Sequence, residues 1–244
     1  MNNKVIYTAI FGKYDKLKKP KVIPEGFDFI CFTDQDLENK TWQIRKVEKE
    51  FEDPTRCARQ IKVRPHKYLS EYEYSIWTDG NIAVNGDMNT LLDKYLQDYD
   101  MAAFDHVCNY PDSRDCIYQE AKAILENNKY NYKDKEEVIK QQIEKYKKIG
   151  YPEHRGLIAS GVLIRKHNDS KLIKVMEDWW CEIKEHSRRD QLSFNYVVWK
   201  NNFDFNLIKE NIYKFRFFLY TSHKNKKIIF RIIKKIKRSC VYKK

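Results

Sequence analysis

The sequence predicts an α/β fold in which helices flank a mostly parallel central sheet. Short β-branched and aromatic runs alternate along the chain with stretches of helical periodicity. No Pro-, Gly- or Ser-rich linker and no internal repeat divides the 244 residues. An apolar content of 42% beside 34% charged residues is ordinary for a globular domain. One large domain is therefore expected.

The first part of the chain is rich in expected strands, each bounded by turn-forming or polar residues. These strands span residues 5–11, 27–33, 41–47, 74–78 and 101–105. A helix is expected after Asp53, because Pro54 would occupy its first position and proline is favoured there. A second helix is expected over 88–98, with apolar residues at helical spacing along one side.

The second part of the chain predicts longer helices around one more strand. Asp134 and Glu137 have the spacing of a capping box, which predicts a helix that ends at Gly150. A long apolar strand is expected over 157–165 and a strong helix over 170–186. Asp190 is suited to cap the helix that follows it.

Cysteine usage and apolar run lengths indicate an intracellular protein. The six cysteines include no CxxC pair, so we expect reduced thiols and neither a zinc knuckle nor a disulfide framework. No apolar run reaches the roughly 18 residues of a membrane span. The N-terminal segment has too short an apolar core for a secretory signal. A cytoplasmic location is therefore expected.

The formal charge of +12 comes entirely from the end of the chain. Residues 211–244 contain 12 Lys or Arg and no Asp or Glu, which leaves 35 basic and 35 acidic residues in 1–210. A protein that binds duplex nucleic acid needs a basic surface on its folded body. We therefore expect no nucleic-acid partner.

The basic tail, residues 224–244, has the pattern of an amphipathic helix. Its isoleucines recur at helical spacing, and Lys and Arg fill the other side: Ile228, Ile229, Ile232, Ile233 and Ile236 form the apolar side. Such a helix is suited to lie in an anionic membrane surface, which predicts peripheral association with the inner face of the membrane. A calmodulin-like target, an RNA-binding arm or packing onto the domain would share this composition.

The segment YSIWTDGNIAV places Asp79, Gly80 and Asn81 directly after an expected buried strand. An Asp-Gly pair between apolar runs indicates a hairpin turn, which spacing alone favours. Oxygen ligands two residues apart could instead converge on one hard cation. GxGxxG, GxxxxGK[ST] and GxSxG motifs do not occur in the sequence. A bound nucleotide would therefore rely on a metal and basic side chains to hold its phosphates.

Seven segments resemble, in order, the family of predicted glycosyltransferases related to plant mucilage and pectin proteins. They are VIYTAIFGKYD, FDFICFTD, PTRCARQIKVRPHKYL, YSIWTDGNIAV, CIYQEAKAI, GLIASGVLIRKHN and RRDQLSFNYVVWKN. The resemblance implies a Rossmann-like type A glycosyltransferase domain over 1–223, followed by the tail. Bacterial members lie among surface-polysaccharide genes. It therefore implies transfer of a hexose-like sugar from a nucleotide-sugar donor to a hydroxyl of a surface glycan, such as capsule or lipopolysaccharide, or of a lipid-linked acceptor.

The resemblance also implies which residues bind the donor. Asp79, Asn81 and His223 would hold Mn²⁺ or Mg²⁺, with an amide in place of the second carboxylate of an Asp-x-Asp motif. Contacts to the nucleotide sugar would come from strand ends, from one helical face and from this motif: Thr8, Ala9, Phe11, Asp34, Arg56, Arg59, Lys62, Asp79, Gly80 and Asn81. The three basic residues among them recur every third position, which places them on one helical face. A solvated face is the usual explanation of such a cluster, but its position directly before the strand that ends at Asp79 favours contact with the diphosphate.

The sugar and acceptor side of the site is implied in the same way. Asp190 and Gln191, together with Asp79, would be catalytic, and the Asp-Gln pair weakly favours retention of configuration. Acceptor or sugar contacts would come from His106, Arg114, Glu120, Ser160 and Gly161. A catalytically inactive carbohydrate-binding or membrane-tethered scaffold of the same fold is the alternative. A nucleic-acid-binding protein is supported by the tail alone.

Overall fold

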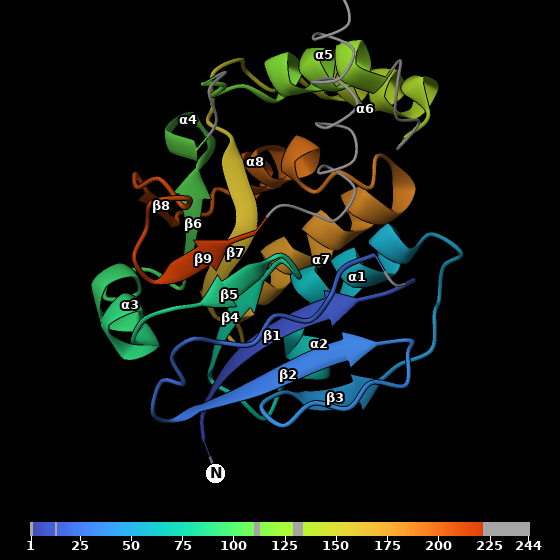
Figure 1. Cartoon of the computed structure of the whole chain (residues 1–244). Coiled ribbons are helices and arrows are strands. Elements are labelled where there is room, and N and C mark those ends of the chain that lie inside the picture. The colour runs from blue at the N-terminus through green and yellow to red at the C-terminus, as the bar shows by residue number, and fades with distance from the viewer. Residues whose placement is uncertain (1, 13, 110–112, 129–133, 222–244) are drawn as a thin grey trace, which may run out of the picture.

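The computed structural model describes residues 2–12, 14–109, 113–128 and 134–221, and these build one seven-stranded sheet flanked by helices (Figure 1). The strand order is β3-β2-β1-β4-β7-β6-β8. Its strands are β1 (Lys4–Ile10), β2 (Phe27–Thr33), β3 (Gln43–Lys46), β4 (Tyr74–Thr78), β6 (Met101–Asp105), β7 (Ile158–Lys166) and β8 (Asn206–Ile208). Only β7 in this sheet runs antiparallel to its neighbours. The predicted mostly parallel α/β fold is confirmed.

Two apolar layers cover the two faces of the sheet. Val5 and Tyr7 of β1 belong to a core formed with α1, α7 and α8, whereas Ile6 and Ile10 belong to one formed with α3, β5 and β9. This alternation follows from the two-residue period of a strand. The helices are α1 (Pro54–Val63), α2 (Pro65–Tyr68), α3 (Met88–Tyr95), α4 (His106–Asn109), α5 (Ile117–Asn128), α6 (Glu136–Ile149), α7 (Ser170–Glu185) and α8 (Gln191–Lys200).

Three local predictions need correction. The strand expected over 41–47 is shorter, and the helix expected over 88–98 ends at Tyr95. The capping box at Asp134 is wrong, because Lys135 is the N-cap of α6 and makes no side-chain cap bond. Asp134 instead accepts a hydrogen bond from Ser187, so a tertiary contact replaces the local one.

The Asp79 segment turns, but it does not form a hairpin. The N–H of Ile82 donates to the carbonyl of Asp79 at 2.8 Å, which closes a tight turn. The strands on either side then separate: β4 pairs with β1 and β7, while β5 (Ile82–Val84) pairs with β9 (Phe218–Tyr220). The chain therefore leaves the central sheet at this turn.

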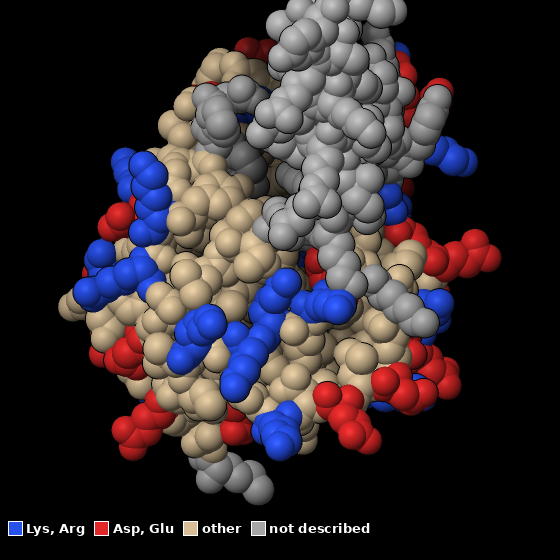
Figure 2. Space-filling view, viewed as in Figure 1, with Lys and Arg blue, Asp and Glu red and all other residues tan. Residues whose placement is uncertain are grey.

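Lysine and arginine side chains gather over the middle of one face of the molecule (Figure 2). The connection between β1 and β2 crosses this face, and its Lys16, Lys19 and Lys21 are exposed. The N–H of Lys21 donates to the carbonyl of Val84, which holds the connection beside β5.

Within the described ranges, no helix has the length and apolar character needed to cross a membrane. The cysteines described there are free, as predicted, and Cys240 lies outside them.

Candidate functional site

A cavity of about 470 Å³ opens at the carboxyl ends of β1 and β4. From β1 the chain continues to β2 and β3 on one side of the sheet, whereas β4 lies on the other side. Ligands of open α/β sheets bind at such a switch point. The lining includes seven residues that the sequence singled out: Ala9, Phe11, Arg59, Asp79, Gly80, Asp190 and Gln191.

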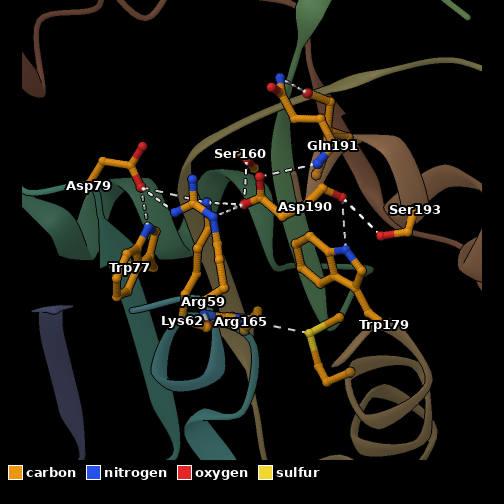
Figure 3. Close-up of polar contacts among 12 residues, drawn as sticks. Arg59, Lys62, Trp77, Asp79, Ser160, Arg165, Trp179, Asp190, Gln191 and Ser193 are labelled. Carbon is orange, nitrogen blue, oxygen red and sulfur yellow. Dashed lines mark hydrogen bonds and ion pairs between the residues drawn. The ribbon is translucent and has the colours of Figure 1, made fainter. Parts of the chain in front are cut away.

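Asp190 lies at the inner end of this cavity and is almost fully buried. Its Oδ2 lies 2.5 Å from Nζ of Lys62 and 3.2 Å from Nε of Arg59, and it accepts a hydrogen bond from Ser160 at 3.0 Å (Figure 3). Its Oδ1 accepts a hydrogen bond from the N–H of Gln191, so Asp190 also caps α8, as predicted. The Asp190 carboxylate thus contacts the first N–H of α8 as well as Arg59 and Lys62.

The protonation state of this cluster follows from burial and charge. Burial opposes ionisation of Asp190, but Arg59 and Lys62 outweigh it and lower its pKa to about 2. Burial lowers the pKa of Lys62, and repulsion from Arg59 adds to this effect. Burial acts in the same sense on Arg59, where Asp190 and Asp79 reverse it and raise the pKa. Asp190 is therefore ionised at neutral pH.

Buried contacts fix Lys62 at the end of α1. Its carbonyl accepts hydrogen bonds from the hydroxyl of Tyr7 at 2.7 Å and from the guanidinium of Arg165 at 2.9 Å. Its ammonium lies 5.6 Å from the ring centroid of Trp77, within reach of a cation–π interaction. Because the side chain is fully buried, its charge is held at one point.

Asp79 lies at the mouth of the cavity, with its side chain 29% exposed. Its Oδ1 accepts a hydrogen bond from Nε1 of Trp77 at 2.8 Å, and it lies 3.6 Å from Lys62 and 3.8 Å from Arg59. The adjoining turn leaves little room for a side chain, because a Cβ on Gly80 would lie 3.1 Å from Cβ of Asp15. Two carboxylates from different segments and two cations from α1 therefore meet at one site.

Of the three predicted metal ligands, Asp79 and Asn81 lie in the part of the chain that the structure describes. Asn81 is buried, and its side-chain amide donates to the carbonyl of Thr221 at 3.1 Å. One oxygen of Asp79 already faces Trp77 and two cations. Among the described residues, no group of three His, Cys, Asp or Glu side chains is arranged to hold a metal ion. His223 lies outside those residues. An amide turned to Thr221 and a carboxylate oxygen that faces two cations fit a divalent cation poorly.

Four other predicted donor contacts lie outside the cavity lining, and one of them, Lys62, is buried directly behind Arg59 and Asp190. Arg56 donates to the carbonyls of Lys184 at 2.8 Å and His186 at 3.1 Å, at the end of α7. Asp34 accepts from the N–H of Gly12 at 3.1 Å, and Thr8 is buried. Arg56 points away from the face that carries Arg59 and Lys62. Residues three apart in an α-helix are about 60° short of a full turn, so each step of three rotates the side chain further around the helix.

The predicted acceptor residues form two groups. His106 and Arg114 both approach Glu120, at 3.8 Å and 2.7 Å, and burial lowers the pKa of His106. None of these three lines the cavity. Ser160 contacts Asp190 directly. Gly161 accepts from the N–H of Asp79 at 2.8 Å, and a Cβ there would lie 3.2 Å from Ile82. Because Gly161 has no side chain, it leaves space beside Ile82 and Asp79.

Several residues that line the cavity were not predicted from the sequence. Arg188 donates to Asp53 at 2.6 Å, and Asp53 also caps α1 by accepting from the N–H of Thr55. Arg189 lines the cavity beside Asp190, and burial lowers its pKa. The two arginines directly precede the Asp-Gln pair, so the RRDQ run was the available signal. Tyr14 and Asp15 also line the cavity, and they end the family-like segment VIYTAIFGKYD, which was the available signal.

The fold and the site define an α/β protein whose ligand cavity, rich in paired acids and bases, lies at the switch point of a mostly parallel sheet. The particular family follows from the sequence. Residues 1–231 match the family described as TOD1/MUCI70, glycosyltransferase-like domain, and the chain belongs to that family. The predicted resemblance is thereby confirmed.

Individual relatives are distant. The chain is 26% identical over 221 residues to "Probable hexosyltransferase MUCI70" of Arabidopsis thaliana, which covers 79% of this chain and 36% of the relative. It thus spans about a third of the length of that protein. A solved structure titled as a glycosyltransferase involved in glycosylation of the major capsid of PBCV-1 aligns with a TM-score of 0.46 at 11% identity, covering 90% of this chain and 94% of that one. The WbbM bifunctional glycosyltransferase in its apo form aligns with a TM-score of 0.44 at 8% identity, covering 84% and 38%.

Proposed function

We propose that this glycosyltransferase-like protein transfers a hexose from a nucleotide-sugar donor to a hydroxyl group. The observation that carries the proposal is the cavity at the switch point of the sheet, where Arg59 and Lys62 face Asp79 and Asp190. Cations at this position suit a diphosphate, and carboxylates suit sugar hydroxyls. The description of the Arabidopsis relative as a probable hexosyltransferase supports a hexose as the transferred group.

The proposed reaction exchanges one C–O bond for another. The bond between the anomeric carbon and the diphosphate oxygen breaks, and its electron pair leaves with the nucleoside diphosphate. The acceptor oxygen bonds to the anomeric carbon, and the acceptor proton is released. Positive charge develops on the sugar ring and negative charge on the leaving diphosphate, so the ionised Asp190 and the adjacent cations would stabilise opposite ends of the transition state.

We also propose that the acceptor is a surface glycan or a lipid-linked precursor at the inner face of the membrane. The connection between β1 and β2, which carries the exposed Lys16, Lys19 and Lys21, supports this, because it crosses the face over which Lys and Arg side chains gather (Figures 1 and 2). Basic residues near an anionic bilayer each contribute on the order of 1 kcal/mol. The basic tail and His223 lie outside the described residues, so the tail helix remains a prediction.

The donor assay is the first test of this function. The protein is incubated with a panel of nucleotide hexoses, and release of free nucleoside diphosphate is measured with and without added glycan acceptors. We expect release from one donor of the panel, and loss of release in Asp79→Ala. Binding of glycans without release of nucleoside diphosphate from any donor would instead support the inactive scaffold.

A further inference from the structure

The site has a mismatch between its acidic motif and the chemistry of metal binding. Asp79 and Asn81 are spaced as metal ligands, yet the amide of Asn81 is turned to the carbonyl of Thr221 and is buried. That bond, with two further bonds from Thr221 to the carbonyl of Asn81, ties the turn to the end of β9. Asn81 therefore has a structural task, and Asp79 faces cations on one side.

Lys62 and Arg59 come from consecutive turns of α1, and both approach the two carboxylates of the site (Figure 3). Two like charges held side by side repel each other, as the lowered pKa of Lys62 reflects. A fold keeps such a pair where an anion compensates it.

The two cations differ in how fully the protein engages them. Nζ of Lys62 is fully buried and lies 2.5 Å from Asp190, whereas Nε of Arg59 lies 3.2 Å from Asp190 and makes no aligned hydrogen bond within the described residues. Buried donors that lack an aligned acceptor are uncommon and call for a partner. The guanidinium of Arg59 also lines the cavity, so a ligand can reach it.

We propose that Arg59 and Lys62, and not a divalent cation held by Asp79 and Asn81, neutralise the diphosphate of the donor. This inference rests on the proposed function. Arg59 forms charge-assisted hydrogen bonds to phosphate oxygens from the cavity wall, and the buried Lys62 adds a fixed positive charge behind it. Asp190 holds both cations in place between turnovers, and Asp79 sets the position of Arg59 at the mouth.

Calorimetric titration with UDP, GDP, dTDP and ADP tests the inference. Each nucleotide is titrated into the full chain, once in excess EDTA and once with Mn²⁺. We expect one nucleotide to bind in EDTA with an affinity within about threefold of its affinity with Mn²⁺. Binding that requires Mn²⁺, or that weakens more than about tenfold in EDTA, overturns the inference and leaves the proposed function standing. Failure of all four to bind in either buffer overturns both.

Charge variants on one helix identify the groups responsible. Arg59→Gln should weaken binding in EDTA by about tenfold or more, Mn²⁺ should not restore it, and Arg59→Lys should retain part of the affinity. Arg56→Gln is the matched control, because Arg56 lies one turn earlier on α1 and bonds to the end of α7. Wild-type affinity in Arg59→Gln, with the fold intact by circular dichroism, would refute the assignment.

Discussion

Replacement of Asp190 by asparagine tests the electrostatic core of the site most directly. Asparagine has nearly the same size and can still cap α8, so the change removes a charge and little else. In the wild type, that charge faces the fully buried ammonium of Lys62 at 2.5 Å and the guanidinium of Arg59 at 3.2 Å. Without it, two cations remain in a poorly solvated place.

The expected loss of unfolding free energy at neutral pH is about 3–5 kcal/mol, the usual cost of removing one partner of a buried ion pair. The pKa of Asp190 gives a similar scale: a fall from 3.8 to about 2 corresponds to roughly 2.5 kcal/mol. Because this pKa is depressed on folding, the contribution is complete above the unfolded value of 3.8 and is lost as the pH falls toward about 2.

The variant should also show a distinct dependence on alkaline pH. Loss of the carboxylate lowers the pKa of Lys62 further below its unfolded value of 10.5. Between the folded and unfolded pKa values, the unfolded chain binds more protons, so the stability of the variant rises with pH. The difference in unfolding free energy between wild type and variant should therefore become smaller from about pH 7 toward about pH 10.

Urea unfolding, followed by tryptophan fluorescence at both pH values, measures this gap. Ser160→Ala is the control, because it removes one hydrogen bond to Asp190 and leaves every charge in place. It should cost about 1–2 kcal/mol, with no change between the two pH values. A loss below about 1 kcal/mol in Asp190→Asn, or a gap that does not depend on pH, would refute the reasoning.

Further predictions address the neighbouring residues and the tail. Asp79→Ala should abolish release of nucleoside diphosphate and cost about 1–3 kcal/mol in urea unfolding, because Nε1 of Trp77 loses its acceptor; near-normal turnover would exclude a role in transfer. Arg56→Gln should lower the unfolding free energy by about 1–2 kcal/mol without changing the KM for the donor, because it removes bonds to the end of α7; a raised KM would return Arg56 to the donor site. Gly161→Val should reduce kcat, because its Cβ would lie 3.2 Å from Ile82 and 3.7 Å from Oδ2 of Asp79; unchanged kinetics would show that the gap is unused. Truncation after Asn225 should abolish co-sedimentation with anionic liposomes, and binding of the full chain should weaken as salt rises; equal binding to neutral liposomes would contradict the electrostatic part.

Local patterns were sufficient to predict the elements that carry the site. The strands at 27–33 and 74–78 have the predicted bounds, because β-branched and aromatic runs end there at polar or turn-forming residues. Asp53 caps α1 and Asp190 caps α8, as their positions before helical segments indicate. Each of these features depends on residues that are close together in the chain.

Contacts between distant segments were not predictable in the same way. Arg59 and Lys62 reach Asp190 across more than a hundred residues, while Arg56, on the same helix, turns to the end of α7. The spacing places all three on one helix, but the packing of α1 against β1 and α7 determines which of them faces the cavity. The amide of Asn81 is likewise held by a distant segment, because it donates to the carbonyl of Thr221, the residue directly after β9. The sequence specifies the type of each residue, and spacing along a helix specifies the direction of its side chain around the helix axis. The partners of that side chain are determined by which distant segments the sheet brings together.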